Sequence, residues 1–121
     1  MNKASIKSFE DLEVWKQSIV LGKKLYLNNR NNLADPIINQ LLRASVSISN
    51  NIAEGHDRSS TKDYIRFLYI SRGSCAELRS LLILASEVKV LNNSNSTELI
   101  EQTLRITRML SALINSLKRR L

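Results

Sequence analysis

Residues 63–90 read DYIRFLYISRGSCAELRSLLILASEVKV, the longest uninterrupted helical pattern in the chain. Apolar side chains recur in it at alternating intervals of three and four, which places them on one face of a helix. Ser60 and Asp63 open the pattern as a capping-box pair, whose side chains satisfy backbone amides at a helix N-terminus. A helix over residues 61–90 would be a rod of roughly 40 to 45 Å at 1.5 Å per residue. We expect this rod to be the spine of an all-α fold.

Two seams with three-four spacing run along this predicted helix. The first is expected to face the bundle interior and consists of Phe67, Ser71, Ser74, Leu78, Leu81, Ala85 and Val88. The second mixes apolar groups with two arginines, and we interpret it as an oligomer interface: Ile65, Tyr69, Arg72, Ala76, Arg79 and Ile83. Gly73 lies mid-helix, where glycine costs about 1 kcal/mol relative to alanine. It is therefore expected to permit close approach by another helix, within the bundle or across a subunit boundary.

Three more helices are predicted, over about 9–28, 36–54 and 97–118. The first begins after the capping-box pair Ser8 and Asp11. The second begins at Pro36, because proline lacks an amide that would be unpaired in a first turn, and Gly55 is expected to end it in a left-handed cap. The Asn-rich stretches 28–32 and 92–96 are expected to be loops.

Each of these helices has a predicted inner face. In the helix over 9–28 it is Leu12, Trp15, Ile19, Gly22 and Tyr26. In the helix over 36–54 it is Ile37, Leu41, Ala44, Ile48 and Ile52, and in the helix over 97–118 it is Leu99, Ile106, Leu110, Leu113 and Leu117. Four helices with short loops make an up-down-up-down bundle the simplest topology, and 121 residues suit a single domain over 1–121.

Composition indicates the compartment. Cys75 is the single cysteine and cannot form an internal disulfide, so the chain is typical of a reduced, cytoplasmic protein. The N-terminal MNKASIKSFEDLEVW has no apolar run like a secretory signal, and no stretch approaches the roughly 20 apolar residues of a membrane span. We expect no membrane partner.

The charge indicates a polyanionic partner. The net charge of +7 favours nucleic acid through counterion release. The predicted binding residues lie on the outer side and C-terminal end of the helix over 97–118: Arg105, Arg108, Lys118, Arg119 and Arg120. A basic face is usually only a solvated face. An oligomer would multiply the charge, since five subunits at +7 would carry +35. No base-reading motif is present, so binding to RNA or DNA is expected to be sequence-nonspecific.

Three stretches resemble one known family: FEDLEVWKQSIVL (9–21), LLRASVSISNNIAEG (41–55) and DYIRFLYISRGSCAELRSLL (63–82). In this order they are similar to the 23S rRNA intervening-sequence proteins, also called four-helix-bundle proteins, over roughly residues 9–90. The matching motif residues are Asn51, Ile52, Ala53, Glu54, Gly55, Gly73, Ser74 and Glu77. The C-terminal helix matches only in pattern.

That resemblance implies an up-down bundle assembled as a ring-shaped homopentamer, from a family known through insertions in large-subunit rRNA genes. A distant relative of the same architecture, the accessory protein of diversity-generating retroelements, is a basic pentamer that binds a reverse transcriptase and nucleic acid. The present chain is similar to it only in shape and charge.

Glu54, His56 and Asp57 are the candidates for a metal or catalytic site, because carboxylate and imidazole groups at close spacing suit divalent ions. The favoured interpretation is different: Glu54 at a helix C-terminus is expected to pair with Arg58, Lys62 or another arginine. The alternative interpretation places Glu54 at a partner-binding edge with Asn50 and Asn51. No cofactor motif, P-loop or nucleophilic triad is present, and Cys75 at heptad spacing is expected to be a packed thiol.

Three functions are therefore considered. The first is an oligomeric, non-enzymatic RNA- or DNA-binding accessory protein. The second is an oligomeric scaffold for a protein partner, with the basic charge serving solubility. The third and least favoured is a metal-dependent nuclease.

Overall fold

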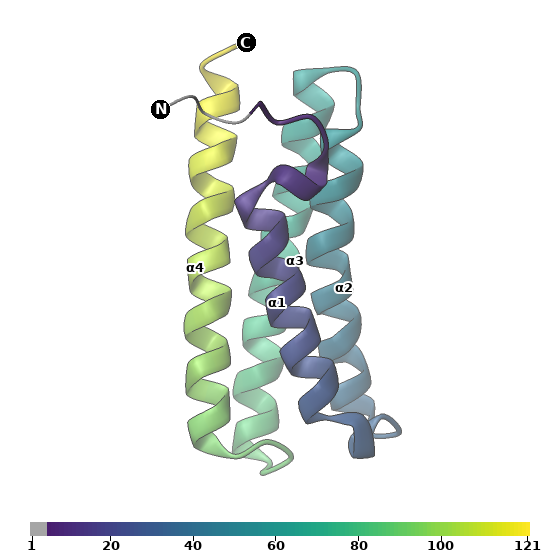
Figure 1. Ribbon diagram of the computed structural model, residues 1–121. Coiled ribbons are helices and arrows are strands. Elements are labelled where there is room, and N and C mark those ends of the chain that lie inside the picture. Colours follow the sequence, from purple (N-terminus) through teal and green to yellow (C-terminus); the bar gives the residue numbers. More distant parts are fainter. Residues whose placement is uncertain (1–4) are drawn as a thin grey trace.

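The computed structural model describes residues 5–121, apart from the side chains of residues 93 and 94. Within this range the chain forms four α-helices and no strand: α1 (Glu13–Asn28), α2 (Pro36–His56), α3 (Thr61–Glu87) and α4 (Asn93–Lys118). Successive helices run in opposite directions, and α1 also packs on α4 to close the bundle (Figure 1). The predicted all-α, up-down-up-down architecture is confirmed.

The starts of α2 and α3 follow the predicted capping residues. Asp35 Oδ1 accepts the amide N–H of Ile37 at 2.9 Å, directly before Pro36. Ser60 Oγ accepts the amide N–H of Asp63 at 3.1 Å and begins α3. Both contacts satisfy donors that have no partner within the helix.

The start of α4 was predicted incorrectly, because the expected loop over 92–96 is its first turn. Asn92 Oδ1 accepts the amide N–H of Asn95 at 2.9 Å, so the asparagine caps the helix. Asparagine is unfavourable inside a helix but among the best N-cap residues, and this preference prevails here.

Two other boundaries also differ from prediction. Ser8 and Asp11 begin a 3-10 turn over Phe9–Asp11, and α1 starts only at Glu13. At the other end, α3 stops at Glu87 because Lys89 adopts a left-handed conformation with φ of 64°. The amides of Val90 and Leu91 then bond back to the carbonyl of Ala85, at 2.9 and 3.2 Å. Val88, predicted to face the interior, is consequently 52% exposed.

The core is centred on α2 and α3, which share the most extensive contact. The buried residues that match prediction are Leu12, Leu41, Ala44, Ile48, Ile52, Phe67, Ser71, Ser74, Leu78, Ala85, Leu99, Ile106, Leu110 and Leu117. Its serines are hydrogen-bonded across the two helices. Ser71 Oγ donates to the carbonyl of Ile48 at 2.9 Å, and Ser47 Oγ and Ser74 Oγ share a bond of 2.8 Å.

The predicted inner face of the first helix is wrong at Ile19 and Tyr26, whereas Leu12 is buried and Trp15 packs half-buried against the core. The buried residues of α1 are Val14, Ser18, Leu21 and Leu25, whereas Ile19 and Tyr26 are 41% and 50% exposed. Both sets have three-four spacing, and Ser18 makes the true set look less apolar. Its hydroxyl is satisfied locally, because Ser18 Oγ donates to the carbonyl of Trp15 at 2.6 Å.

Gly55 does not form the left-handed cap predicted for it. It is buried inside α2, which continues to His56, and no described glycine has a positive φ. A Cβ on Gly55 would lie 2.7 Å from Phe67 Cβ. The glycine is therefore required by the close approach of α2 and α3.

No helix within residues 5–121 has both the length and the apolar character needed to cross a bilayer.

Candidate nucleic-acid interface

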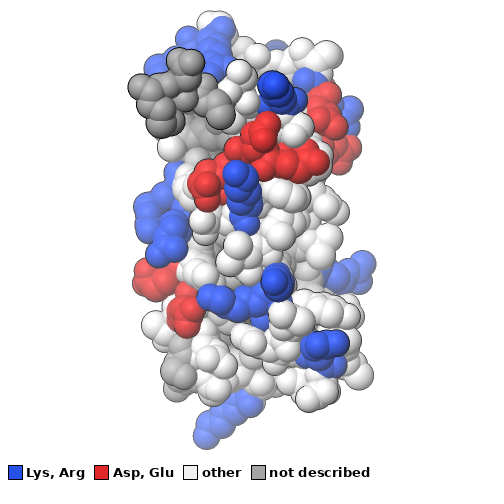
Figure 2. All heavy atoms as spheres, in the orientation of Figure 1, with Lys and Arg blue, Asp and Glu red and all other residues white. Residues whose placement is uncertain are grey.

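The cations predicted to bind nucleic acid are all exposed in the structure: Arg105, Arg108, Lys118, Arg119 and Arg120. The ion pairs found within residues 5–121 join Lys24 to Glu98, Arg58 to Glu54, and Arg66 to Asp63, so none involves this set. On the α4 side of the bundle, Figure 2 shows basic side chains at mid-height and at the end where the chain terminates, with acidic side chains below the former. The α4 cations are thus left without a carboxylate partner among the described residues.

These cations form two groups rather than one patch. Arg105 and Arg108 lie in the middle of α4, and Arg119 lies about 21 Å from Arg105 along the helix axis at 1.5 Å per residue. The C-terminal group lies beside the start of α3. Burial raises the pKa of Tyr64 to about 12, and the nearby charge of Arg120 acts in the opposite direction.

An aromatic side chain joins the C-terminal group, which sequence reasoning did not foresee. Lys118 Nζ lies 5.1 Å from the ring centroid of Tyr69, and the Arg72 guanidinium lies 4.8 Å from it. Arg72 Nη1 also donates to Ser111 Oγ on α4 at 3.1 Å. We call Tyr69, Arg72, Ser111 and Lys118 the Tyr69 cluster. The signal in the sequence was a tyrosine three residues before an arginine on one helix, but the lysine that contacts the tyrosine is 49 residues away.

The predicted oligomer seam on α3 is not one continuous surface. Ile65 is buried within the chain, so its assignment to a subunit interface is wrong. Arg72 and Arg79 are half-buried, and Arg72 is held by α4 as described. Tyr69, Ala76 and Ile83 are exposed.

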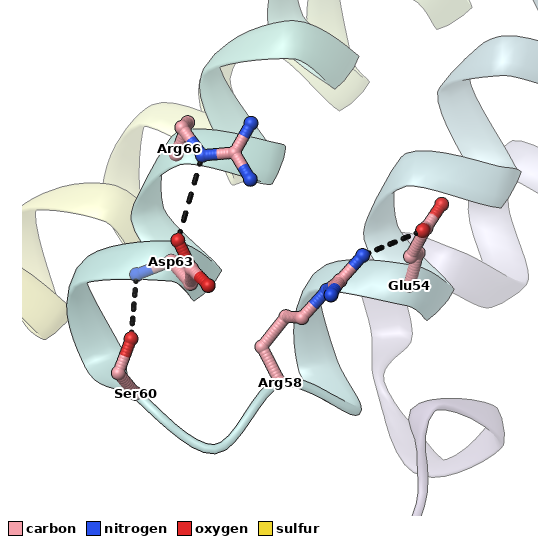
Figure 3. A network of polar contacts seen from close by, with 5 residues as sticks. All are labelled: Glu54, Arg58, Ser60, Asp63 and Arg66. Carbon is pink, nitrogen blue, oxygen red and sulfur yellow. Dashed lines mark hydrogen bonds and ion pairs between the residues drawn. The ribbon is translucent and has the colours of Figure 1, made fainter.

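The end of α2 is occupied by the ion pair expected of Glu54. Arg58 Nη2 donates to Glu54 Oε1 at 2.7 Å, and Figure 3 shows Arg58 reaching back from the loop to that carboxylate. Across the loop, Asp63 pairs with Arg66 at 3.5 Å. Both arginines also lie over the Phe67 ring at 4.6 Å. The predicted pairing of Glu54 with Arg58 is confirmed.

The His56 ring packs against an aromatic side chain of α3, Tyr64. It meets Tyr64 edge-on at 5.6 Å, and its Nδ1 is buried with no hydrogen-bond partner among the described residues. No group of three His, Cys, Asp or Glu side chains suited to a metal ion occurs within residues 5–121, side chains 93 and 94 apart. Cys75 is packed as predicted, and burial raises the pKa of its thiol to about 11.

A groove between α1 and α2 is a second surface that the sequence analysis missed. Two adjoining hollows of about 350 and 530 Å³ share Tyr26, Leu42 and Val46 as lining residues. Val46 is 56% exposed, and Lys23 and Arg43 are the charged residues of the lining. We call this surface the α1–α2 groove.

Gly73 is exposed, and a Cβ built on it would meet no atom within 4 Å. The expectation that it permits close approach within the bundle is therefore wrong. Approach across a subunit boundary stays a prediction.

Comparison with known proteins identifies the family. The model of the family described as 23S rRNA-intervening sequence protein matches residues 10–112. The chain belongs to this family. A solved structure of a protein of unknown function, from the S23 ribosomal protein family of Bacteroides thetaiotaomicron, has a TM-score of 0.78 and 20% sequence identity. The match covers 84% of the present chain and 97% of that one, and it shows the shared fold. No curated protein matches closely enough to count as a relative.

Proposed function

We propose that this member of the 23S rRNA intervening-sequence family is a non-enzymatic, oligomeric accessory protein that binds the phosphate backbone of nucleic acid. The observation that supports it most is the set of exposed α4 cations without carboxylate partners among residues 5–121. Glu101 precedes Arg105 by four residues, yet the two form no ion pair. Arg105 is therefore not engaged in an ion pair along its own helix.

Unpaired cations are available to phosphate oxygens, and each phosphate they neutralise releases condensed counterions. The net charge of +7 adds long-range attraction to any polyanion. Contacts to phosphate carry no sequence information, so the proposed binding is sequence-nonspecific. The family's description connects it with 23S rRNA, and RNA is therefore the first nucleic acid to test.

The experiment is a binding titration of a labelled structured RNA at several salt concentrations. Changing Arg105, Arg108 and Arg119 together to glutamine should weaken binding and flatten its salt dependence, by up to about 0.9 units of the log-log slope for each phosphate that the variant no longer neutralises. The folded state should be nearly as stable, because exposed charges contribute little to it.

A matched control removes the same charge from α1 and from two loops, outside the α1–α2 groove. Lys16, Arg30 and Lys89 are exposed and unpaired among the described residues, and changing all three to glutamine should alter binding less. Equal weakening in the two triple variants would mean that net charge, and not the α4 surface, drives binding. Undetectable binding by the unmodified protein at low salt would refute the proposal.

We propose further that copies of the chain assemble as a ring, and we expect the ring to be a homopentamer. Two unlike exposed surfaces support this. One is the α1–α2 groove, whose charged lining is basic. The other is a row on α3 formed by Ile70, Gly73, Glu77 and Leu84, which we call the α3 ridge; its members are exposed and their spacing places them on one helix face.

The ridge of one copy is complementary to the groove of the next. Its apolar groups match the apolar floor, and its glycine permits close approach of backbone. Its Glu77, which lines a hollow with Arg43 of its own copy, is opposite in charge to Lys23 on the rim of the next. Contact between unlike surfaces generates a closed ring when the rotation closes, whereas contact between like surfaces gives a dimer.

Light scattering tests the assembly. Val46→Glu in the groove or Leu84→Glu in the ridge should lower the measured mass, and Gly73→Leu should do so by adding bulk to the ridge. Val20→Glu is the control, because Val20 is also exposed but lies on α1 outside the groove lining. A stable 13.8 kDa monomer of the unmodified protein at micromolar concentration would refute the ring.

The second function considered is a scaffold for a protein partner without nucleic-acid binding. The α1–α2 groove favours it, because an apolar groove between two helices suits an amphipathic helix. Two results together would support this function. The unmodified protein would bind a protein partner but no RNA, and Val46→Glu in the groove would no longer bind that partner. The cytoplasmic location stays a prediction.

A further inference from the structure

We infer that the Tyr69 cluster is a stacking site for a base of single-stranded nucleic acid, with Lys118 binding the adjacent phosphate. The inference rests on the proposed function, because it names the form of nucleic acid that the basic surface would take. It assigns Tyr69 to ligand binding, with Arg72 orienting its ring, instead of assigning both to the subunit contact predicted from the sequence.

The first support is the accessibility of an aromatic ring within a basic surface. Tyr69 is 37% exposed, and two cations lie over its ring at 4.8 and 5.1 Å. Cations gather at a ring face because of its negative quadrupole. Because the exposed Lys118 contacts the Tyr69 ring, that side of the ring is accessible to groups in solvent. A nucleobase presents a flat π-face to such a ring, and its phosphate lies within reach of the same cations.

The second support is the difference between the two cations. Arg72 is half-buried and anchored, because Nη1 donates to Ser111 Oγ at 3.1 Å. Lys118 is exposed, and its contact with the Tyr69 ring is the interaction found for it among the described residues. Its flexible stem allows Nζ to leave the ring for a phosphate oxygen while a base takes its place. Arg72 remains against the ring and keeps it oriented.

The third support concerns the form of nucleic acid. In a duplex the face of each base is covered by its neighbours, so a side-chain ring on a protein surface has no base to stack on. Single strands expose their bases, and stacking on aromatic groups tolerates any sequence. This agrees with the sequence-nonspecific binding that phosphate contacts support.

The experiment compares a labelled oligothymidylate with a DNA duplex of equal length, by fluorescence anisotropy at several salt concentrations. Tyr69→Leu should weaken single-strand binding about tenfold or more, with little change for the duplex. Its salt slope should equal that of the parent, because tyrosine carries no charge. Tyr69→Phe should retain binding, and Lys118→Gln should lower the single-strand slope by about 0.7.

Tyr26→Leu is the control, since Tyr26 is also an exposed tyrosine. Because Tyr26 lines the α1–α2 groove, both variants are compared with the parent on fractions of equal mass, selected by light scattering. Circular dichroism and melting of each variant establish that it is folded. Single-strand binding that is equal in Tyr69→Leu and the parent, while the triple α4 variant is weakened, would overturn the stacking site and leave the proposed function standing. Equal weakening in Tyr69→Leu and Tyr26→Leu would also overturn it. Absence of binding by the parent would overturn both.

Discussion

Replacing Gly55 with alanine tests the close packing of α2 on α3. The new Cβ would lie 2.7 Å from Phe67 Cβ and 3.3 Å from the Tyr64 carbonyl oxygen. Neither atom ends a flexible side chain, so the two helices must separate. Alanine gains about 1 kcal/mol in helix propensity, and overpacking costs about 1 to 3 kcal/mol. Because 2.7 Å is shorter than folded proteins tolerate, we use the upper part of that cost and expect a net loss of about 1 to 2 kcal/mol in the free energy of unfolding.

Gly73→Ala provides the matched control, because it makes the same substitution inside a helix without any atom within 4 Å. It should stabilise the chain by about 1 kcal/mol at protein concentrations low enough to keep it monomeric. Urea denaturation followed by circular dichroism measures both variants. If Gly55→Ala proved as stable as Gly73→Ala, the inferred close approach of α2 and α3 would be refuted.

Three further predictions concern stability. Ser71→Ala removes the hydroxyl bond to Ile48 and should lower the free energy of unfolding by about 1 kcal/mol in urea denaturation; no change would mean that the bond contributes nothing. Burial raises the Cys75 pKa from 9.0 to about 11, so the thiol ionises at lower pH in the unfolded chain than in the folded one. The contribution of this thiol to the free energy of unfolding is therefore fully present below about pH 9 and should be lost as the pH rises towards 11. In melts across that range, Cys75→Ala should show a smaller fall than the parent. Lys89→Gly should raise the melting temperature, since glycine adopts a φ of 64° without a Cβ penalty; a lower value would contradict the strain.

Much of the fold was predictable because local signals agreed with tertiary packing. Asp35 and Ser60 cap α2 and α3 where the sequence placed them, and the apolar stripe of α2 is its buried face. The boundaries at Lys89 and Asn92 were missed because each depends on a conformation that composition does not specify. A lysine took the left-handed position usual for glycine, and an asparagine that suggested a loop became a cap.

The candidate site was predictable only in part. The α4 cations were identified from helix periodicity and are exposed as expected. The Tyr69 cluster was not, because Lys118 and Ser111 reach α3 only once the bundle has formed. The α1–α2 groove was hidden by the wrong inner face: Ile19 and Tyr26 were expected to be buried, whereas their exposure helps create the groove. Two stripes of equal spacing cannot be ranked without knowing how Ser18 is satisfied.

The hydroxyl bonds between α2 and α3 prevent the two helices from sliding past each other. Two helices that meet only through aliphatic ridges resemble themselves after a shift of one turn, about 5.4 Å. Here such a shift would separate Ser47 Oγ from Ser74 Oγ, whose bond needs a hydroxyl on each helix and contributes about 1 kcal/mol. Ser71 Oγ would have to leave the carbonyl of Ile48 for another carbonyl of α2. In one direction it would also bring Asn51 or Ile52, which carry a Cβ, opposite Phe67. The α2–α3 pair therefore has a single favoured alignment. That alignment also fixes the relative positions of exposed side chains on the two helices.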